Sequence, residues 1–265
     1  MTLFIAQDAL SIGCGALVGF TLGLIGGGGS VLAVPLLVYV VGTASPHIAI
    51  GTSAVAVATS ALTNLVGHAR SHTVKWRCAA VFAVVGVLGA ALGAALGKMV
   101  DGQKLLALFG ALMIVVALAM LRRRKDGGDP DVRLAAESAR QLLPALVGTA
   151  LVVGGLSGFF GIGGGFLIVP GLVGATNMPL INAVGSSLVS VSAFGLTTAI
   201  SYALSGLVDW RIAGFFILGG IAGGIAGIWL SQRLAARKRA LSLVFASVVM
   251  MVGVYVVIRG VLALV

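Results

Sequence analysis

Two clusters of glycine in this sequence could bind a ligand through the polypeptide backbone. Their predicted ligand-lining members are Gly26, Gly27, Gly28, Gly29, Gly161, Gly163, Gly164 and Gly165. Glycine lets a ligand approach the backbone, and a helix that begins at such a break presents N–H groups and the positive end of its dipole. This chemistry suits a small anion. Glycine also serves close helix packing, and the sequence leaves that alternative open.

Neutral hydroxyl side chains recur near the glycine clusters. Thr52 and Ser53 in the segment IGTS match Ser186 and Ser187 in VGSS, and Ser30 follows the first cluster directly. A hydroxyl donates to an oxyanion without adding a permanent counter-charge. We predict that these five side chains and the glycines bind the substrate. The alternative for each hydroxyl is an interhelical hydrogen bond or a bond to a carbonyl of its own helix.

Four further residues are candidates for coupling or gating: Asn64, His68, Trp76 and Trp210. Histidine has an ordinary pKa near neutrality, so His68 could couple transport to protons, although interfacial histidines are often only solvated. Trp76 and Trp210 begin equivalent segments and are predicted either as interfacial anchors or as a gate at a pore mouth. The interiors of the apolar segments contain no charged residue, so we expect no carboxylate proton relay of the usual pump type.

Motifs of the common enzyme classes are missing from the sequence. It contains no HExxH, no GxSxG and no P-loop, because no Gly-Lys-Ser or Gly-Lys-Thr follows either glycine cluster. Cys14 and Cys78 form no disulfide framework and are predicted to be packing residues. We therefore expect a protein that is not an enzyme, with no catalytic residue, no metal site and no cofactor.

The elements that position these residues are predicted to be helices in a lipid bilayer. Of the 265 residues, 59% are hydrophobic and 9% are charged, whereas soluble domains carry about 25% charged residues. The net charge of +10 lies mainly in short loops, which indicates membrane orientation and no binding of nucleic acid. Ten apolar runs are predicted, at residues 3–24, 29–43, 47–69, 76–97, 104–121, 141–160, 165–178, 180–203, 211–231 and 240–258.

The two halves of the chain resemble one another. The segment GLIGGGGSVLAVP at 23–35 aligns with GFFGIGGGFLIVP at 158–170, and IGTS then aligns with VGSS. A duplication over most of each half is typical of secondary transporters. The predicted parts are a first membrane repeat at 1–121, a cytoplasmic linker at 122–140 and a second membrane repeat at 141–265.

Loop charges indicate that the repeats are inverted. The loop at 70–77 is basic, whereas Asp209 and Arg211 cancel in the equivalent loop. Equivalent loops of inverted repeats face opposite sides, and basic loops face the cytoplasm. Inversion needs an odd number of crossings per half, which five spans satisfy, as do three spans plus a re-entrant hairpin. We predict an all-α polytopic membrane protein of two inverted repeats, each with about five hydrophobic segments, some short, broken or re-entrant at the glycine clusters.

The duplicated motifs that end at Pro35 and Pro170, with IGTS, VGSS and the closing SHTVKW and SGLVDW, resemble the TauE/SafE family of membrane permeases. The resemblance covers nearly the whole chain outside the linker. Members of that family are associated with export of sulfite and with transport of sulfonates, thiosulfate and related organosulfur anions. The resemblance implies that the family's glycine motif falls on residues 26–30 and 161–165. Lys75 departs from Asp209 of the second half and makes the first loop more basic.

The residues and the resemblance together predict a secondary transporter of a small sulfur-containing anion, with export favoured over import. Its expected location is the bacterial plasma membrane, and its expected partners are the anion and the lipid bilayer. The chain contains no nucleotide-binding segment, so ion gradients or the membrane potential would supply the energy. Two alternatives stay open: an anion channel, and a membrane accessory protein that transports nothing and uses its glycines only for packing.

Overall fold

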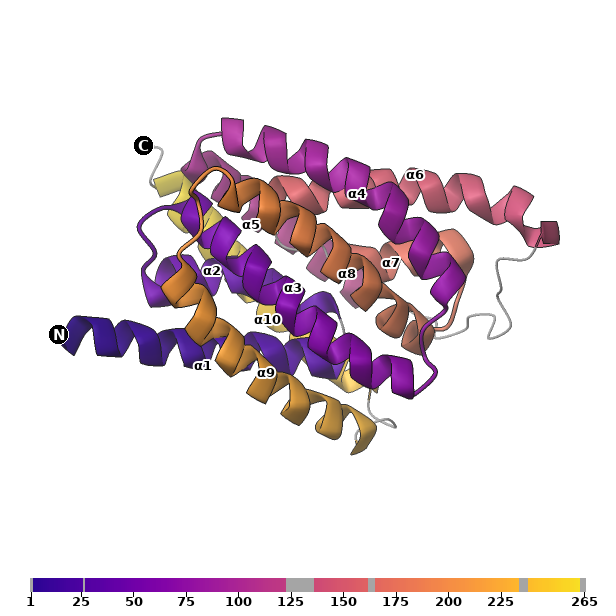
Figure 1. The fold of residues 1–265 in the computed structure, drawn as a ribbon, viewed down its shortest axis with the longest axis horizontal. Coiled ribbons are helices and arrows are strands. Elements are labelled where there is room, and N and C mark those ends of the chain that lie inside the picture. The colour runs from indigo at the N-terminus through magenta and orange to yellow at the C-terminus, as the bar shows by residue number, and fades with distance from the viewer. Residues whose placement is uncertain (1, 26, 123–135, 162–164, 234–237, 263–265) are drawn as a thin grey trace.

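The computed structural model is a bundle of long helices (Figure 1). It describes residues 2–25, 27–122, 136–161, 165–233 and 238–262. Each helix in these ranges overlaps a predicted apolar run, so the prediction of an all-α polytopic fold is confirmed. Among the described residues, eight helices are long and apolar enough to cross a membrane, and two apolar helices are shorter.

The first half has four long helices, the second of which is the central helix α3, and a short broken segment. Its elements are α1 (Thr2–Ile25), η1 (Gly27–Leu32), α2 (Ala33–Leu36), η2 (Leu37–Val41), α3 (Pro46–Arg70), α4 (Trp76–Met99) and α5 (Gly102–Arg122). The broken segment is 3₁₀-helical in η1 and π-helical in η2. Gly42 ends it with a φ of 74°, which favours glycine, and Ser45 caps α3 by accepting a hydrogen bond from the N–H of Ile48.

The second half repeats this order of elements. They are α6 (Ala136–Phe160), α7 (Gly165–Thr176), α8 (Leu180–Ala203), α9 (Trp210–Arg233) and α10 (Lys238–Leu262). Here α7 takes the place of the broken segment, and Pro170 lies inside it. Both halves therefore place a short helix between their first long helix and their central helix.

The first short segment runs the length of α1 in the reverse direction. The amide Nε2 of Gln7, near the start of α1, donates a hydrogen bond of 3.2 Å to the carbonyl of Val41, the last residue of η2. The chain therefore leaves the end of α1 and comes back to its beginning before α3 starts. The starts of α1 and α3 therefore lie at the same end of the bundle.

Helix α1 packs parallel to α9 along a stripe of glycines. A Cβ atom would collide with the backbone of Phe216 if added to Gly15, of Gly220 if added to Gly19, and of Gly224 if added to Gly23. Residue numbers rise together along both helices, so the two helices run in the same direction. The absence of side chains lets the backbones touch, which is how small residues support helix packing in membranes.

Helix α4 packs parallel to α6 in the equivalent way. A Cβ atom at Gly89 would collide with the carbonyl of Leu151, and one at Gly97 with the carbonyl of Phe159. The first long helix of each half thus packs on the fourth element of the other half. The glycines at 86, 89 and 93 and their counterparts at 220, 223 and 227 all lie at these two interfaces.

Between the halves, α3 packs antiparallel to α8, and α5 packs antiparallel to α10. A Cβ atom at Gly51 of α3 would contact Tyr202 of α8, and one at Gly195 would contact Ala58. Gly110 of α5 likewise approaches Val257 of α10. Because α4 folds back on α3 and α9 folds back on α8, α4 and α9 also run in opposite directions.

The bundle has two ends, which we name by one residue each. At the Asp8 end, the carboxylate of Asp8 pairs with Arg211 at the start of α9, and the Nζ of Lys98 donates to the hydroxyl of Ser205 after α8. At the Lys75 end, the backbone of Lys75 at the start of α4 contacts the side chain of Ser186 in the first turns of α8.

Candidate functional site

The described parts of the two glycine clusters lie in the interior of the bundle. The turn η1 contacts both α7 and α8. Gly27 and Gly28 are within η1, and Gly29, Ser30, Gly161 and Gly165 are buried. The structure therefore brings the first break against the helix that begins at the second break. Gly26, Gly163 and Gly164 lie outside the described residues.

Two of these glycines are required by packing. A Cβ atom at Gly29 would collide with the backbone of Leu22 and the side chain of Thr21, in the last turns of α1. Gly161 has a φ of 66°, and a Cβ atom there would collide with the side chain of Ile50 in α3. The packing alternative raised by the sequence therefore accounts for glycine at these two positions.

Thr52 and Ser186 make the same contact in opposite halves. The hydroxyl oxygen of Thr52 accepts a hydrogen bond of 3.0 Å from the backbone N–H of Asp209, and that of Ser186 accepts one of 2.9 Å from the N–H of Lys75. We call these two contacts the central latches. Each fastens the central helix of one half to the loop that precedes the fourth element of the other half.

The glycine before each latch residue lets that loop approach. A Cβ atom at Gly51 would collide with the carbonyl of Leu207, and one at Gly185 would lie 2.7 Å from the hydroxyl and 3.1 Å from the carbonyl oxygen of Thr73. The side-chain amide of Asn182 also donates to the carbonyl of Thr73, at 3.1 Å. The matching IGTS and VGSS segments thus combine one glycine for close approach with one hydroxyl acceptor.

The second hydroxyl of each pair bonds within its own helix. Ser53 donates to the carbonyl of Ile50 and Ser187 to that of Val184, both at 2.8 Å. In contrast, the latch hydroxyls of Thr52 and Ser186 act as acceptors, so each still has a hydrogen to donate. All four side chains are fully buried, and a ligand would reach them only after the bundle opens.

The buried polar side chains of the described residues are all neutral. They are Ser11, Ser30, Thr52, Ser53, Ser60, Asn64, Ser157, Thr176, Ser186, Ser187, Ser190, Ser192 and Thr198. Burial of an unpaired charge is far more costly than burial of a hydroxyl. An anion in this interior would therefore be held by N–H and O–H donors and not by a fixed cation.

Five buried hydroxyls in the described part of the chain have no hydrogen-bond partner: those of Thr43, Ser157, Ser190, Thr198 and Tyr202. Our sequence-based site set does not include them. A Ser, Thr or Tyr in an apolar run indicates a polar atom within the membrane. The sequence does not show whether that hydroxyl has a hydrogen-bond partner. Such atoms are costly to bury without a partner, which makes Ser190 and Thr198 of α8 further candidate donors.

The four candidate gating residues do not gather at one site. Asn64 is buried beside the backbone of Gly224 in α9. A ring nitrogen of His68 lies 3.1 Å from the hydroxyl of Thr73, near the Ser186 latch. Trp76 and Trp210 are the first residues of α4 and α9, and their side chains are 54% and 65% exposed. This placement on the outer surface suits the anchor interpretation better than the gate.

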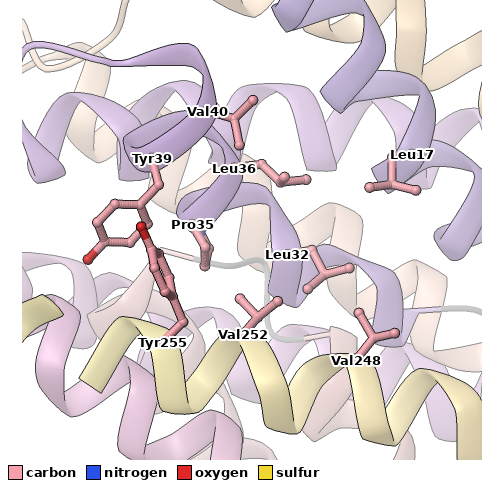
Figure 2. A pocket seen from close by; sticks show the side chains of 9 residues that line it. All are labelled: Leu17, Leu32, Pro35, Leu36, Tyr39, Val40, Val248, Val252 and Tyr255. Carbon is pink, nitrogen blue, oxygen red and sulfur yellow. The ribbon is translucent and has the colours of Figure 1, made fainter. Parts of the chain in front are cut away.

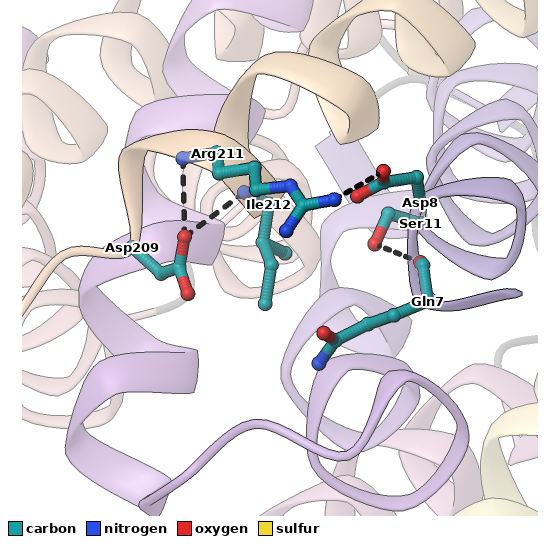
Figure 3. A network of polar contacts seen from close by, with 6 residues as sticks. All are labelled: Gln7, Asp8, Ser11, Asp209, Arg211 and Ile212. Carbon is teal, nitrogen blue, oxygen red and sulfur yellow. Dashed lines mark hydrogen bonds and ion pairs between the residues drawn. The ribbon is translucent and has the colours of Figure 1, made fainter. Parts of the chain in front are cut away.

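A polar network at the Asp8 end holds α1 to α9 (Figure 3). Arg211 Nη2 lies 2.6 Å from the carboxylate of Asp8, and Asp209 Oδ1 caps α9 by accepting from the N–H groups of Arg211 and Ile212 at 3.0 Å. Asp209 therefore takes part both in this cap and, through its own N–H, in the Thr52 latch. Within the described ranges, no three His, Cys, Asp or Glu side chains gather closely enough to hold a metal ion.

Comparisons with known proteins agree with this architecture. The model of the family described as "Sulfite exporter TauE/SafE" matches residues 11–256. A "Probable membrane transporter protein" of Xylella fastidiosa (strain 9a5c) is 53% identical over 251 residues, which cover 95% of each chain. The "Probable membrane transporter protein YunE" of Bacillus subtilis is 25% identical and covers 93% of this chain and 96% of its own length. No solved structure matches the chain.

Proposed function

Because the chain belongs to the sulfite exporter TauE/SafE family, we propose that it is a secondary transporter that exports a small sulfur-containing anion, such as sulfite, thiosulfate or a sulfonate, by alternating access. It is a multi-pass bacterial membrane protein, and its relatives carry the name of probable membrane transporters. The observation that carries the proposal is the pair of central latches. One latch lies toward each end of the bundle, and both have the same chemistry.

Alternating access follows from two such contacts in repeats of opposite direction. In transporters built from inverted repeats, the outward-open and inward-open states arise by rocking one repeat against the other around a fixed site. Opening the Thr52 latch would separate α3 from the loop before α9 at the Asp8 end. Opening the Ser186 latch would separate α8 from the loop before α4 at the Lys75 end. With both latches formed, the interior is closed to both sides.

The substrate site is proposed between the two glycine breaks and the latch residues. Donors there would be backbone N–H groups at the breaks and the hydroxyls of Ser30, Thr52, Ser53, Ser186 and Ser187. These donors are neutral, so they can bind an oxyanion and still release it. A negative-inside membrane potential favours exit of an anion by about 2.3 kcal/mol per charge per 100 mV, so export needs no proton relay.

Charge at the two ends supports a cytoplasmic Lys75 end. At the Asp8 end, the cations Lys98, Lys104, Arg211 and Arg259 are nearly balanced by Asp8, Asp101 and Asp209. The other Lys and Arg residues of the sequence fall at 70–77, at 122–140 or at 233–239. Those that the structure describes lie in helix ends or the loop at the Lys75 end: Arg70, Lys75, Arg77, Arg122, Arg140, Arg233, Lys238 and Arg239. The positive-inside rule then places this end, including the linker, in the cytoplasm.

The test is flux of sulfite, thiosulfate, a short sulfonate and sulfate in proteoliposomes. We expect saturable flux of one sulfur anion that is accelerated by the same anion on the opposite side. Ser186→Ala is expected to raise KM or abolish flux, whereas Ser186→Thr keeps the hydroxyl and retains flux. Ser192→Ala is the matched control, because Ser192 is also buried in α8 but donates only to Leu188 of its own helix.

Each other outcome contradicts a defined part of the proposal. Flux without saturation or counterflow would indicate an anion channel. Transport of none of the four anions by a folded protein would reject the substrate class and favour the accessory role. Equal KM and flux in wild type, Ser186→Ala and Ser192→Ala would remove Ser186 from the site.

A further inference from the structure

A groove opens on the side of the bundle between α1 and α10 (Figure 2). It has a volume of about 180 Å³. Leu32, Pro35 and Leu36 of the first short segment form its floor, and Leu17 of α1 and Val248 and Val252 of α10 form its walls. The groove thus lies directly over the irregular η1–α2–η2 backbone.

The walls of the groove face outward and are apolar. Leu17 is 48% exposed, and Val248 is 40% exposed. In a multi-pass membrane protein, such a lateral surface borders lipid and not water. The floor residues Leu32, Pro35 and Leu36 are apolar too, so the groove offers a hydrocarbon chain an apolar surface on every side.

Polar groups stand at one end of the groove, at the Asp8 end of the bundle. The rings of Tyr39 and Tyr255 meet edge to face with centroids 5.2 Å apart, and the guanidinium of Arg259 lies 5.9 Å from the Tyr255 ring centroid. A second hollow of about 280 Å³ adjoins this point and is lined by Tyr39, Gln103, Arg259 and Leu262. An apolar trough therefore leads to a site with a cation, an amide and two phenols.

We propose that this groove binds a glycerophospholipid, with one acyl chain over Pro35 and Val252 and the phosphate at Arg259. The groove is apolar along most of its length and polar at one end, as such a lipid has an apolar acyl chain and a charged headgroup. Arginine pairs with phosphate through two parallel hydrogen bonds, and tyrosines at the membrane interface sit at the level of the headgroups. The lipid belongs to the leaflet at the Asp8 end and seals the short segment against α10.

The test uses the purified full-length protein and a phosphatidylglycerol that carries a photoreactive diazirine on one acyl chain. We expect crosslinks to the peptide that contains Val248 and Val252. Val252→Trp fills the groove and should abolish these crosslinks, whereas Val254→Trp, on the exposed side of the same helix, should leave them unchanged. Arg259→Gln should lower labelling at least about fivefold through loss of the charged pair, and Lys104→Gln should not.

A diacylglycerol with the same photoreactive chain but no phosphate headgroup measures how much of the labelling depends on the headgroup. We expect it to label wild type at least about fivefold less than phosphatidylglycerol does, and to label wild type and Arg259→Gln equally. Equal labelling by both probes would overturn the phosphate site at Arg259. Labelling that is equal in wild type, Val252→Trp and Val254→Trp would overturn the groove itself. If Val252→Trp does not fold, the peptide labelled in wild type and the effect of Arg259→Gln decide the proposal.

Discussion

The hydroxyl oxygen of Thr52 accepts a hydrogen bond of 3.0 Å from the backbone N–H of Asp209, 157 residues later in the chain. Ser186 repeats this contact with Lys75 at 2.9 Å. Each bond satisfies a backbone donor in the loop before a long helix. The two halves therefore depend on one another for the placement of α4 and α9.

Removing the acceptor of a latch should destabilise the bundle. Thr52→Val keeps the shape of the side chain but leaves the N–H of Asp209 without its acceptor, which costs about 1–3 kcal/mol. Thr52→Ser restores the hydroxyl and should lose less than half as much. Unfolding of the purified protein in mixed micelles measures both changes. Equal stability of the valine and serine variants would show that the hydrogen bond contributes nothing.

The glycine stripe between α1 and α9 should tolerate no methyl group. A Cβ atom at Gly19 would collide with the backbone of Gly220, so Gly19→Ala is expected to destabilise the protein by about 1–3 kcal/mol through overpacking. Gly13 lies on the same helix with no atom within 4 Å of an added Cβ, and Gly13→Ala is the control. The same unfolding assay should show a neutral or stabilising effect for the control. An equal loss of stability in Gly19→Ala and Gly13→Ala would show that contact with α9 is not the cause.

Gly161 is expected to be coupled to Ile50. Gly161→Ala meets two obstacles, the positive φ of 66° and the collision with the Ile50 side chain. A residue with a Cβ atom at this positive φ loses about 1–2 kcal/mol of stability whatever residue occupies position 50. The collision, in contrast, disappears when Ile50 is replaced by alanine. A double-mutant cycle should therefore give a coupling energy of at least about 0.5 kcal/mol. Strict additivity would mean that the collision relaxes without cost.

The ion pair of Asp8 with Arg211 should add little to stability. Arg211 is 48% exposed and Asp8 19%, and exposed pairs contribute less than about 1 kcal/mol. Arg211→Gln and Asp8→Asn should each shift the unfolding midpoint only slightly, and 0.5 M salt should reduce the difference between them and wild type. A loss of several kcal/mol would instead indicate that the pair is shielded from water in the membrane.

Equivalent turns should be accessible from opposite sides of the membrane. Ser71 after α3 and Ser205 after α8 occupy the same repeat position, and both are exposed. In a background in which Cys14 and Cys78 are replaced by alanine, an impermeant thiol reagent added to intact cells should label Ser205→Cys but not Ser71→Cys. Inside-out vesicles should give the reverse result. Labelling of both residues from one side would reject the inverted arrangement.

The sequence by itself determined the membrane setting, the ten helical segments and the matching motifs of the two halves. These properties are local: about 20 apolar residues favour a membrane helix wherever they occur, and a glycine cluster interrupts a helix regardless of its partners. The described helices overlap the predicted runs for this reason. Whether the glycines and hydroxyls of the predicted site bind an anion is a prediction that flux measurements will decide.

Tertiary structure alone decided which helices pair and what the shared hydroxyls do. The glycine stripes of α1, α4, α6 and α9 look alike in sequence, so nothing local indicates that α1 packs on α9 and α4 on α6. The partner of Ser186 lies 111 residues away in the sequence. The residue type alone does not show whether a hydroxyl binds a ligand or accepts a hydrogen bond from a loop. Close backbone approach and hydrogen bonding between distant segments depend on the packed bundle, and they appear only when both halves are folded together.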